Sequence, residues 1–284
     1  MSEIVTNAAA VEAASEEQTP IIFLDDVKVT FKTRTGSLLH PNKVHAVRGL
    51  TLKLMPGETI GIVGESGCGK STTANVMCGL QKPTEGRVFF KGKDVTNRTA
   101  ADRRTIGRVI SVVFQDPATA LNARMSVRDQ LMDPMVVHKV GDEAYRNARV
   151  RELIEMVGLP ESVLDALPGQ MSGGQRQRVA IARALSLKPD AIIADEPTSA
   201  LDVSVRAQIL NLLMDLKKEL NLAMVFISHD IQTVRYISDR IIVMNGGLAV
   251  EEGTAEQVFN NPKDEYTRLL LGAAPSLLHP DLGK

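Results

Sequence analysis

The 284-residue chain has few cysteines, few aromatic residues, no excess of either charge and no long apolar run. Its two cysteines, Cys68 and Cys78, form no disulfide framework and suit a reducing compartment. The lack of tryptophan and a net charge of −1 argue against nucleic-acid binding. No apolar run approaches the roughly 20 residues of a membrane span. These absences predict a soluble, cytosolic protein that reaches a membrane only through a partner.

The N-terminal part of the chain changes in character after residue 20. Residues 1–20 are acidic and rich in small side chains, and they lack the basic start and apolar core of a signal peptide. We therefore expect a disordered tail there. The following stretches IIFLDDVKVTF, AVRGLTLKLMPGE and GRVFFKGKDV have strand and turn patterns. They predict an antiparallel β subdomain near the N-terminus.

Four short apolar runs each stop at a polar residue or a glycine. They are TIGIV before Gly64, VISVVF before Gln115, AIIA before Asp195 and MVFI before Ser228. Such runs are typical of parallel strands that are covered on both faces. Helical patterns such as QRVAIARALSL and RAQILNLLMDLKKEL lie between them, which predicts an α/β, doubly wound core with a mostly parallel sheet. Ligands of such sheets bind beyond the carboxyl ends of the strands, so the four polar ends should line one site.

Two further segments differ in texture from the core. Residues 117–178 have helical patterns and few strand signals, which predicts a helical subdomain inserted into the core. Residues 255–284 are polar and punctuated by proline, and we interpret them as a C-terminal extension.

The octapeptide GESGCGKS, residues 64–71, fits a phosphate-binding loop between a strand and a helix. Its glycines allow the backbone N–H groups to turn inward on a phosphate. Lys70 would reach the β- and γ-phosphates, and the Ser71 hydroxyl is placed to bind Mg²⁺. Cys68 is interpreted as a small filler within the loop. The predicted nucleotide-binding residues are Gly64, Glu65, Ser66, Gly67, Cys68, Gly69, Lys70, Ser71 and Thr72.

The other strand ends supply groups for hydrolysis of a phosphate bond. Asp195 ends a buried run, where it can hold Mg²⁺, and Glu196 beside it is placed to polarise an attacking water. Gln115 can bind Mg²⁺ through its carbonyl and orient a water, and His229 can bond the γ-phosphate or the water. The predicted catalytic set is Glu196, His229 and Gln115, and the predicted metal ligands are Ser71, Gln115 and Asp195.

A second candidate phosphate site is MSGGQRQR, residues 171–178. A serine and two glycines precede an apolar helical run, which is the arrangement of a helix N-terminus that holds an anion. The chain thus contains two such sites, about a hundred residues apart.

The motifs GESGCGKS, VFQDP, MSGGQRQR, IIADEPTSALD and ISHD occur in this order, and together they resemble the ATP-binding subunit of an ABC transporter. The resemblance covers the chain from residue 21 onward and implies a P-loop NTPase (RecA-like) core, an ABC ATP-binding domain at residues 21–254 and action as a dimer. Each ATP would lie between the phosphate loop of one subunit and the SGGQ segment of the other. The residues implied to contact the partner's ATP are Ser172, Gly173, Gly174 and Gln175, and Asp202 would lie at the dimer seam.

The resemblance also implies roles for the strand-end residues. Glu196 would be the general base, His229 the switch histidine, and Gln115 a sensor of the γ-phosphate. The chain departs from the family in two places. The signature begins with Met171 instead of leucine, and no aromatic residue stands between Phe31 and Gly64 to stack on adenine. The adenine contact stays open between His40, His45 and Val47.

The C-terminal sequence VFNNPKDEYTRLLLGAAPSL is similar to the extension of peptide and nickel importer ATPases. The absence of cysteine after Cys78 matches the subunit type without a C-terminal cysteine cluster. The resemblance implies ATP hydrolysis with Mg²⁺ that powers import of oligopeptides or dipeptides, with nickel, glutathione and sugars as alternatives. The implied partners are a second, identical or different ATPase subunit, two transmembrane permease subunits and an extracytoplasmic substrate-binding protein. The chain would sit peripherally on the cytoplasmic side of the bacterial inner membrane.

A different class of function is an ABC-type ATPase of DNA repair or translation. Repair proteins of this type usually carry a long coiled coil between the two halves of the ATPase. The stretch between Gln115 and Ser172 has no sustained heptads. Translation factors of this type usually have two ATPase domains, whereas this chain has one phosphate loop. The sequence therefore favours a transporter subunit and no nucleic-acid partner.

Overall fold

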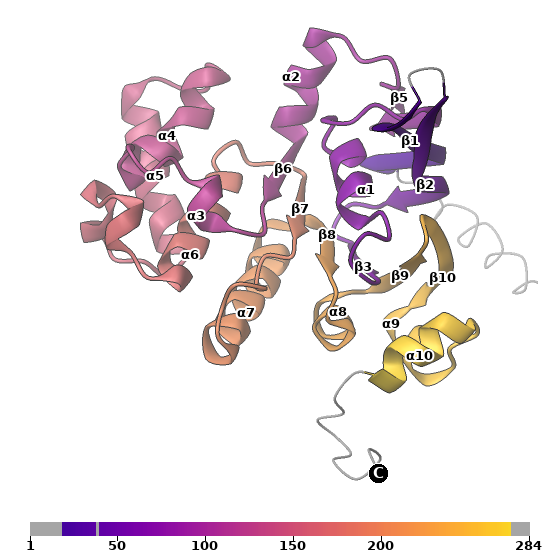
Figure 1. The fold of residues 1–284 in the computed structure, drawn as a ribbon. Coiled ribbons are helices and arrows are strands. Elements are labelled where there is room, and N and C mark those ends of the chain that lie inside the picture. Colours follow the sequence, from indigo (N-terminus) through magenta and orange to yellow (C-terminus); the bar gives the residue numbers. More distant parts are fainter. Residues whose placement is uncertain (1–18, 38–39, 274–284) are drawn as a thin grey trace, which may run out of the picture.

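The computed structural model describes residues 19–37 and 40–273, which form two β-sheets with helices around them (Figure 1). The fold is α/β with a mostly parallel sheet, an antiparallel sheet and a group of helices, as the sequence predicts. The expected disordered tail at residues 1–20 lies outside the described residues except for Thr19 and Pro20. The end of the C-terminal extension, residues 274–284, also lies outside them.

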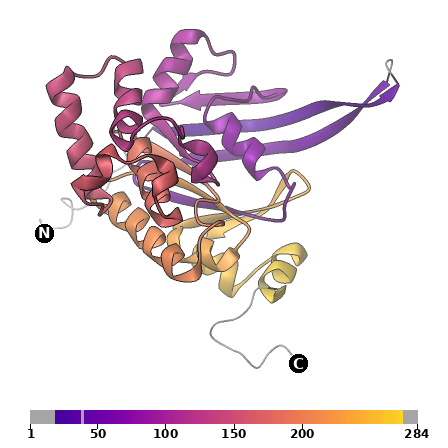
Figure 2. The same cartoon turned by 60° about the vertical axis from the view of Figure 1, so that its left-hand side comes forward.

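The antiparallel sheet has the strand order β2-β1-β4-β5. Its strands are β1 (Ile22–Ser37), β2 (His40–Leu54), β4 (Glu85–Phe90) and β5 (Lys93–Asp94). The alternating residues Leu50, Leu52 and Leu54 are buried, and a turn at Pro56 and Gly57 follows them. Strands β1 and β2 are long, and their far end projects from the body of the molecule as a hairpin (Figure 2).

The larger sheet has the strand order β10-β9-β3-β8-β7-β6, in which every pair is parallel except β10 with β9. Its strands are β3 (Thr59–Val63), β6 (Ile110–Val113), β7 (Ala191–Asp195), β8 (Ala223–Ser228), β9 (Arg240–Asn245) and β10 (Leu248–Thr254). The four predicted apolar runs form β3, β6, β7 and β8. Strands β9 and β10 were not predicted from the sequence.

Both faces of the larger sheet are covered, which explains why its strands are apolar throughout. In β7, Ala191 and Ile193 pack into one hydrophobic cluster with the antiparallel sheet, and Ile192 and Ala194 pack into another with the helices. Successive side chains of a strand point to opposite faces, so neighbouring residues belong to different cores. This arrangement excludes polar residues until the strand ends at Asp195.

The helices fall into three groups. Helix α1 (Lys70–Met77) follows β3, and α2 (Ala100–Val109) leads into β6. A helical group at one end of the molecule comprises α3 (Pro117–Ala120), α4 (Val127–Val137), α5 (Glu143–Met156), α6 (Gly173–Ala184) and the 3₁₀ turns Glu161–Asp165 and Pro168–Gln170. The remaining helices are α7 (Val203–Leu220), α8 (Ile231–Ile237), α9 (Ala255–Asn260) and α10 (Glu265–Ala273).

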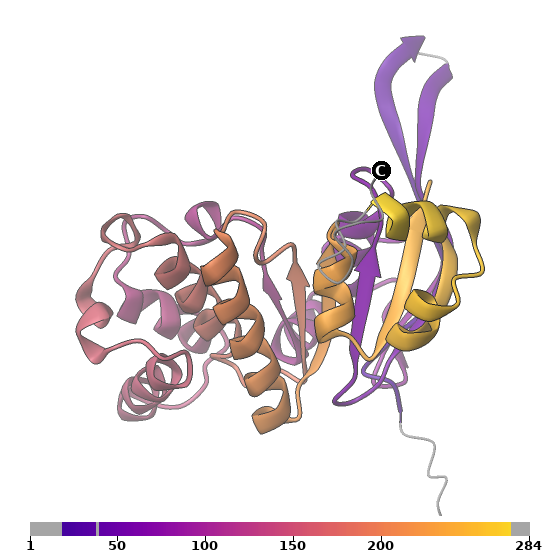
Figure 3. The ribbon, with the colours of Figure 1, turned by 90° about the horizontal axis from the view of Figure 1, so that it is seen from below.

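The helical group and the C-terminal helices lie at opposite ends of the larger sheet (Figure 3). Helices α9 and α10 contact β10, which is the edge strand of the larger sheet opposite to β6. Within the described residues, no helix combines the length and the apolar character that are needed to cross a membrane.

Candidate functional site

The loop between β3 and α1 approaches the neighbouring backbone so closely that two of its positions require glycine. Gly64 has φ +156° and Gly69 has φ +108°. A Cβ at Gly64 would lie 2.1 Å from the Met244 carbonyl oxygen, and one at Gly69 would lie 2.2 Å from that of Ala46. Neither position can hold a side chain without moving backbone. The two glycines therefore fix how the predicted phosphate loop sits against β2 and β9.

Lys70 is the first residue of α1 and is only 6 % exposed. Its ammonium group donates to the carbonyl oxygens of Gly64 at 2.6 Å and Glu65 at 2.9 Å, which compensates for the buried charge. Cys68 is also buried and lies against the same ammonium. Burial raises the pKa of the Cys68 thiol, against the opposing effect of the Lys70 charge. The thiol therefore stays protonated and fills space, as interpreted from the sequence.

The loop borders a cavity of about 330 Å³ at the carboxyl ends of the parallel strands. Three predicted catalytic residues, Gln115, Glu196 and His229, lie on its wall together with Lys70, although they come from three different strand ends. The full lining is Ala46, Ser66, Gly67, Gly69, Lys70, Ser71, Thr72, Gln115, Glu196 and His229. The other predicted loop residues, Gly64, Glu65 and Cys68, do not line the cavity.

Glu196 is the centre of the polar groups in this cavity. Its Oε2 accepts from Gln115 Nε2 at 3.4 Å and lies 3.2 Å from His229 Nδ1. The Glu196 side chain is 18 % exposed and that of His229 is 62 % exposed. The carboxylate is thus partly desolvated, yet it is open on the side of the cavity. Such a group can accept a proton from a water molecule in the cavity.

The backbone at Glu196 is strained, with φ +48° in the left-handed region. This conformation costs about 1 kcal/mol or more for a residue other than glycine. Surrounding contacts hold it: the Glu196 N–H donates to the Ile227 carbonyl at 2.9 Å, and the Ser199 hydroxyl donates to the Glu196 carbonyl at 3.1 Å. The turn points the carboxylate into the cavity, one residue after the end of β7.

Asp195 has the properties of a cation ligand. Its Oδ1 is buried and has no hydrogen-bond partner in the part of the chain that the structure describes. Burial raises the pKa of this carboxyl, a hydrogen bond with Ser71 lowers it, and the charge of Glu196 raises it further. A divalent cation beside Ser71 would satisfy Oδ1 and offset the desolvation, so these residues fit Mg²⁺. Among the described residues, no cluster of three or more His, Cys, Asp or Glu side chains offers another metal site.

The second candidate phosphate site lies at the start of α6, and none of its residues lines the cavity. Ser172 is the N-cap of α6: its hydroxyl accepts from the Gln175 N–H at 3.2 Å, and the Ser172 N–H donates to Gln175 Oε1 at 2.9 Å. Gly174 is needed for packing, since a Cβ there would lie 2.7 Å from a Val205 methyl group. The cavity and the Ser172–Gln175 segment are therefore separate surfaces of the chain.

Asp202 has a local structural role that the sequence analysis did not assign. It is the N-cap of α7, where its Oδ1 accepts from the Val205 N–H at 2.9 Å. An aspartate directly before an apolar helical run is an N-cap signal, so the sequence could have shown this capping role. Position at a dimer seam stays a prediction for this residue.

The structure excludes one of the three residues that the sequence left open for the adenine contact. Val47 is 1 % exposed in the core, so packing of adenine on Val47 is wrong. The His45 ring bonds the Thr30 hydroxyl at 3.0 Å, and the side chain of His40 lies outside the described residues. Ala46, which the sequence analysis missed, lines the cavity.

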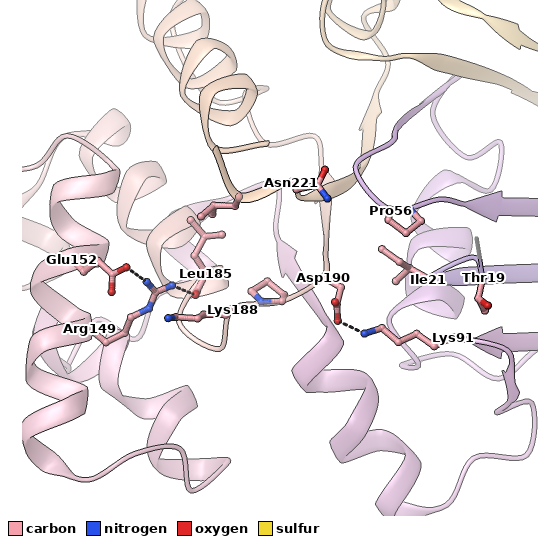
Figure 4. A pocket seen from close by; sticks show the side chains of 12 residues that line it. Thr19, Ile21, Pro56, Lys91, Arg149, Glu152, Leu185, Lys188, Asp190 and Asn221 are labelled. Carbon is pink, nitrogen blue, oxygen red and sulfur yellow. Dashed lines mark hydrogen bonds and ion pairs between the residues drawn. The ribbon is translucent and has the colours of Figure 1, made fainter. Parts of the chain in front are cut away.

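A larger cavity, of about 720 Å³, lies at the other ends of the strands (Figure 4). Asp190 and Asn221, which precede β7 and β8, are on its wall. Its charged groups largely pair with one another: Lys91 with Asp190 at 2.9 Å, and Arg149 with Glu152 at 2.7 Å. None of the twelve lining residues belongs to the predicted site. The smaller cavity is therefore the candidate site.

The chain is similar to known proteins over most of its length. The family model described as ABC transporter matches residues 47–199. The oligopeptide transport ATP-binding protein AppF of Bacillus subtilis is 46 % identical over 93 % of this chain and 80 % of its own length. The dipeptide transport ATP-binding protein DppF of Haemophilus influenzae is 42 % identical over 92 % of this chain and 80 % of its own length.

A solved structure also matches the fold. It is an ATP-binding cassette dimer in a post-hydrolysis state bound to ADP and Pi, and it is 32 % identical with a TM-score of 0.73. The match covers 82 % of this chain and 98 % of that one.

Proposed function

Since this chain belongs to the ABC transporter family, we propose that it is the ATP-hydrolysing subunit of an importer that takes up oligopeptides or dipeptides. The observation that carries the proposal is the cavity in which Lys70 of the phosphate loop faces Glu196 and His229. The substrate class rests on the identity of 42–46 % to transport ATP-binding proteins named for oligopeptides and dipeptides. Nickel, glutathione and sugars are the alternative cargoes.

ATP would bind with its phosphates against the loop. The loop N–H groups and Lys70 supply positive charge for the β- and γ-phosphates, and the start of α1 adds the helix dipole. The adenine would pack on Ala46, because this side chain lines the cavity beside the loop. Lys70 already contacts two loop carbonyls, so its ammonium is oriented before ATP arrives. This preorganisation lowers the cost of binding the phosphates.

Hydrolysis requires a water aligned with the γ-phosphate. Glu196 Oε2 accepts the water proton, while His229 and Gln115 flank that oxygen and fix its direction. As charge moves onto the phosphate oxygens, Lys70 stabilises it, so most of the rate gain comes from positioning and electrostatics. The products are ADP and phosphate.

Mg²⁺ fits the residues at the end of β7. Asp195 Oδ1 and the Ser71 hydroxyl would hold it, with Gln115 as a further oxygen ligand. When bound, Mg²⁺ supplies charge neutralisation for the triphosphate.

The Ser172–Gln175 segment would close over the ATP of a second ATPase subunit. The support is that these residues lie away from the chain's own cavity and cap a helix whose N-terminus can hold an anion. Asp202, at the start of α7, would lie at the seam between the two subunits. Closure on two ATP molecules would move the helical group, α3 to α6, against two permease subunits on the cytoplasmic side of the bacterial inner membrane. An extracytoplasmic binding protein would deliver the peptide.

The test is uptake of labelled dipeptides and oligopeptides by cells that lack the gene and express either wild type or a variant. Lys70→Ala should abolish uptake, because the loop loses its charge on the phosphates. Lys82→Ala, an exposed lysine outside the cavity, is the matched control and should transport normally. Uptake of nickel, glutathione or sugar that depends on Lys70, without peptide uptake, would overturn the substrate class. ATPase activity that DNA or ribosomes stimulate would overturn the transporter assignment.

A further inference from the structure

The side chain of Tyr266, on the C-terminal helix α10, reaches the phosphate loop. The Glu65 N–H donates to the Tyr266 hydroxyl oxygen at 3.0 Å, across 201 residues of sequence. The Tyr266 ring is partly buried and packs against the main hydrophobic cluster. The ring position is therefore set by packing, and the hydroxyl stands at a defined point beside the loop.

The peptide that Tyr266 contacts is the one against which Lys70 rests. Glu65 N and Gly64 O belong to the same planar, trans peptide group, so the N–H and the C=O point in opposite directions. Tyr266 holds the N–H, and the Lys70 ammonium donates to the C=O at 2.6 Å. Hydrogen bonds on the two sides of one amide strengthen each other. A rotation of this peptide would therefore break both contacts together.

The segment that carries Tyr266 is itself anchored by several hydrogen bonds. The two oxygens of Glu251, on β10, accept from the N–H groups of Lys263 at 2.9 Å and Asp264 at 3.0 Å. The Asp264 carboxylate accepts from the Tyr266 N–H at 2.9 Å. Burial acts to raise the pKa of Glu251, but the two N–H groups, the Thr267 hydroxyl and the Lys263 charge together hold the pKa below its ordinary value. The ionised Glu251 carboxylate thus holds the residues before α10 against β10.

We propose that Tyr266 is a positioning residue of the phosphate loop, which holds the Gly64–Glu65 peptide in the orientation that Lys70 needs. Helix α10 then sets the affinity of the site for ATP, and displacement of α10 weakens it. The inference rests on the proposed ATPase function and adds a control element outside the catalytic cavity, since Tyr266 does not line that cavity.

The test is Tyr266→Phe in the full chain, which keeps the packed ring and removes only the hydroxyl. Loss of one hydrogen bond between neutral groups corresponds to about a 2- to 10-fold change in an equilibrium constant. We expect KM for ATP to rise by about this factor while kcat stays within about twofold, because the reacting groups are untouched. Amide hydrogen exchange of the segment that contains Glu65 should become faster, since the Glu65 N–H loses its acceptor.

The matched control is Tyr236→Phe. The Tyr236 hydroxyl also makes one side-chain hydrogen bond, to Asn211 Oδ1 at 2.9 Å, and it lies on α8 outside the cavity. The Tyr236→Phe variant should change neither KM for ATP nor amide exchange at Glu65. A second variant, Glu251→Gln, leaves one acceptor for two N–H groups and should shift both readouts in the direction of Tyr266→Phe.

Three results would overturn the inference: unchanged KM and exchange in Tyr266→Phe, an equal effect of Tyr236→Phe, or no effect of Glu251→Gln. A wild-type chain without ATPase activity would instead contradict the proposed function. Exchange at Glu65 would still test the role of Tyr266 in that case.

Discussion

Replacement of Glu196 by glutamine tests the proposed chemistry most directly. The change keeps the size of the side chain and its backbone conformation, and it removes the negative charge that accepts a proton. With its amide oxygen at the position of Glu196 Oε2, a glutamine at 196 can still accept from Gln115 and from the His229 tautomer that carries its proton on Nδ1. The change in ground-state contacts is therefore small, about 1 kcal/mol or less. ATP affinity should change by less than about fivefold.

The effect on turnover should be much larger. A positioned general base contributes about 10²- to 10⁴-fold to the rate, or about 3–5 kcal/mol of barrier. Single-turnover release of phosphate measures the rate, and equilibrium titration with ATP measures affinity. Glu85→Gln is the control, because Glu85 is an exposed glutamate that pairs with Lys28 outside the cavity. A rate within about fivefold of wild type in Glu196→Gln would refute the assignment of the general base.

Three further substitutions probe the second subunit's contact, the metal ligand and the core. Ser172→Asp keeps an N-cap of equal quality but places a negative charge beside the partner's γ-phosphate, so ATPase activity should fall at least about tenfold with unchanged ATP affinity of the monomer. The control is Thr254→Asp, at the matching capping box of α9, which should leave ATPase activity intact. If the Ser172→Asp monomer loses ATP affinity, that result would contradict a site shared between subunits. Asp195→Asn should raise the Tm of the nucleotide-free protein at pH 7.5, because burial raises the pKa of Asp195 and ionisation therefore opposes folding. This penalty grows as the pH rises above the unfolded pKa of about 4, so the Tm gain should shrink toward pH 4, and a gain that does not depend on pH would argue against ionisation as its cause. Phe226→Ala should lower the free energy of unfolding by about 3–5 kcal/mol in urea titrations, because Phe226 is fully buried. Phe31 is 40 % exposed, so Phe31→Ala should lower it by less than about 1 kcal/mol. Similar losses in the two variants would contradict the placement of Phe226 in the core.

Much of the fold followed from local patterns. The apolar runs that became β3, β6, β7 and β8 are continuous because both sheet faces are covered, and each run stops where the sheet opens to a cavity. Strands β9 and β10 were missed, although β9 pairs with β3 and β10 pairs with β9 to extend the sheet. The packing of Val47 in the core was also missed, because the register shifts between β1 and β2 are not visible in one strand's pattern.

In the candidate site too, some features follow from local sequence patterns and others only from the tertiary structure. By itself, the sequence determined which chemistry-bearing residues stand at strand ends, because a phosphate loop and a carboxylate after an apolar run are local signals. Tertiary structure alone decided that Gln115, Glu196 and His229 meet at one oxygen, since strand order in the sheet sets which ends are neighbours. It also decided the left-handed turn at Glu196 and the contact of Tyr266 with the phosphate loop. These features depend on contacts between residues far apart in the chain, and a local pattern carries no information about such contacts.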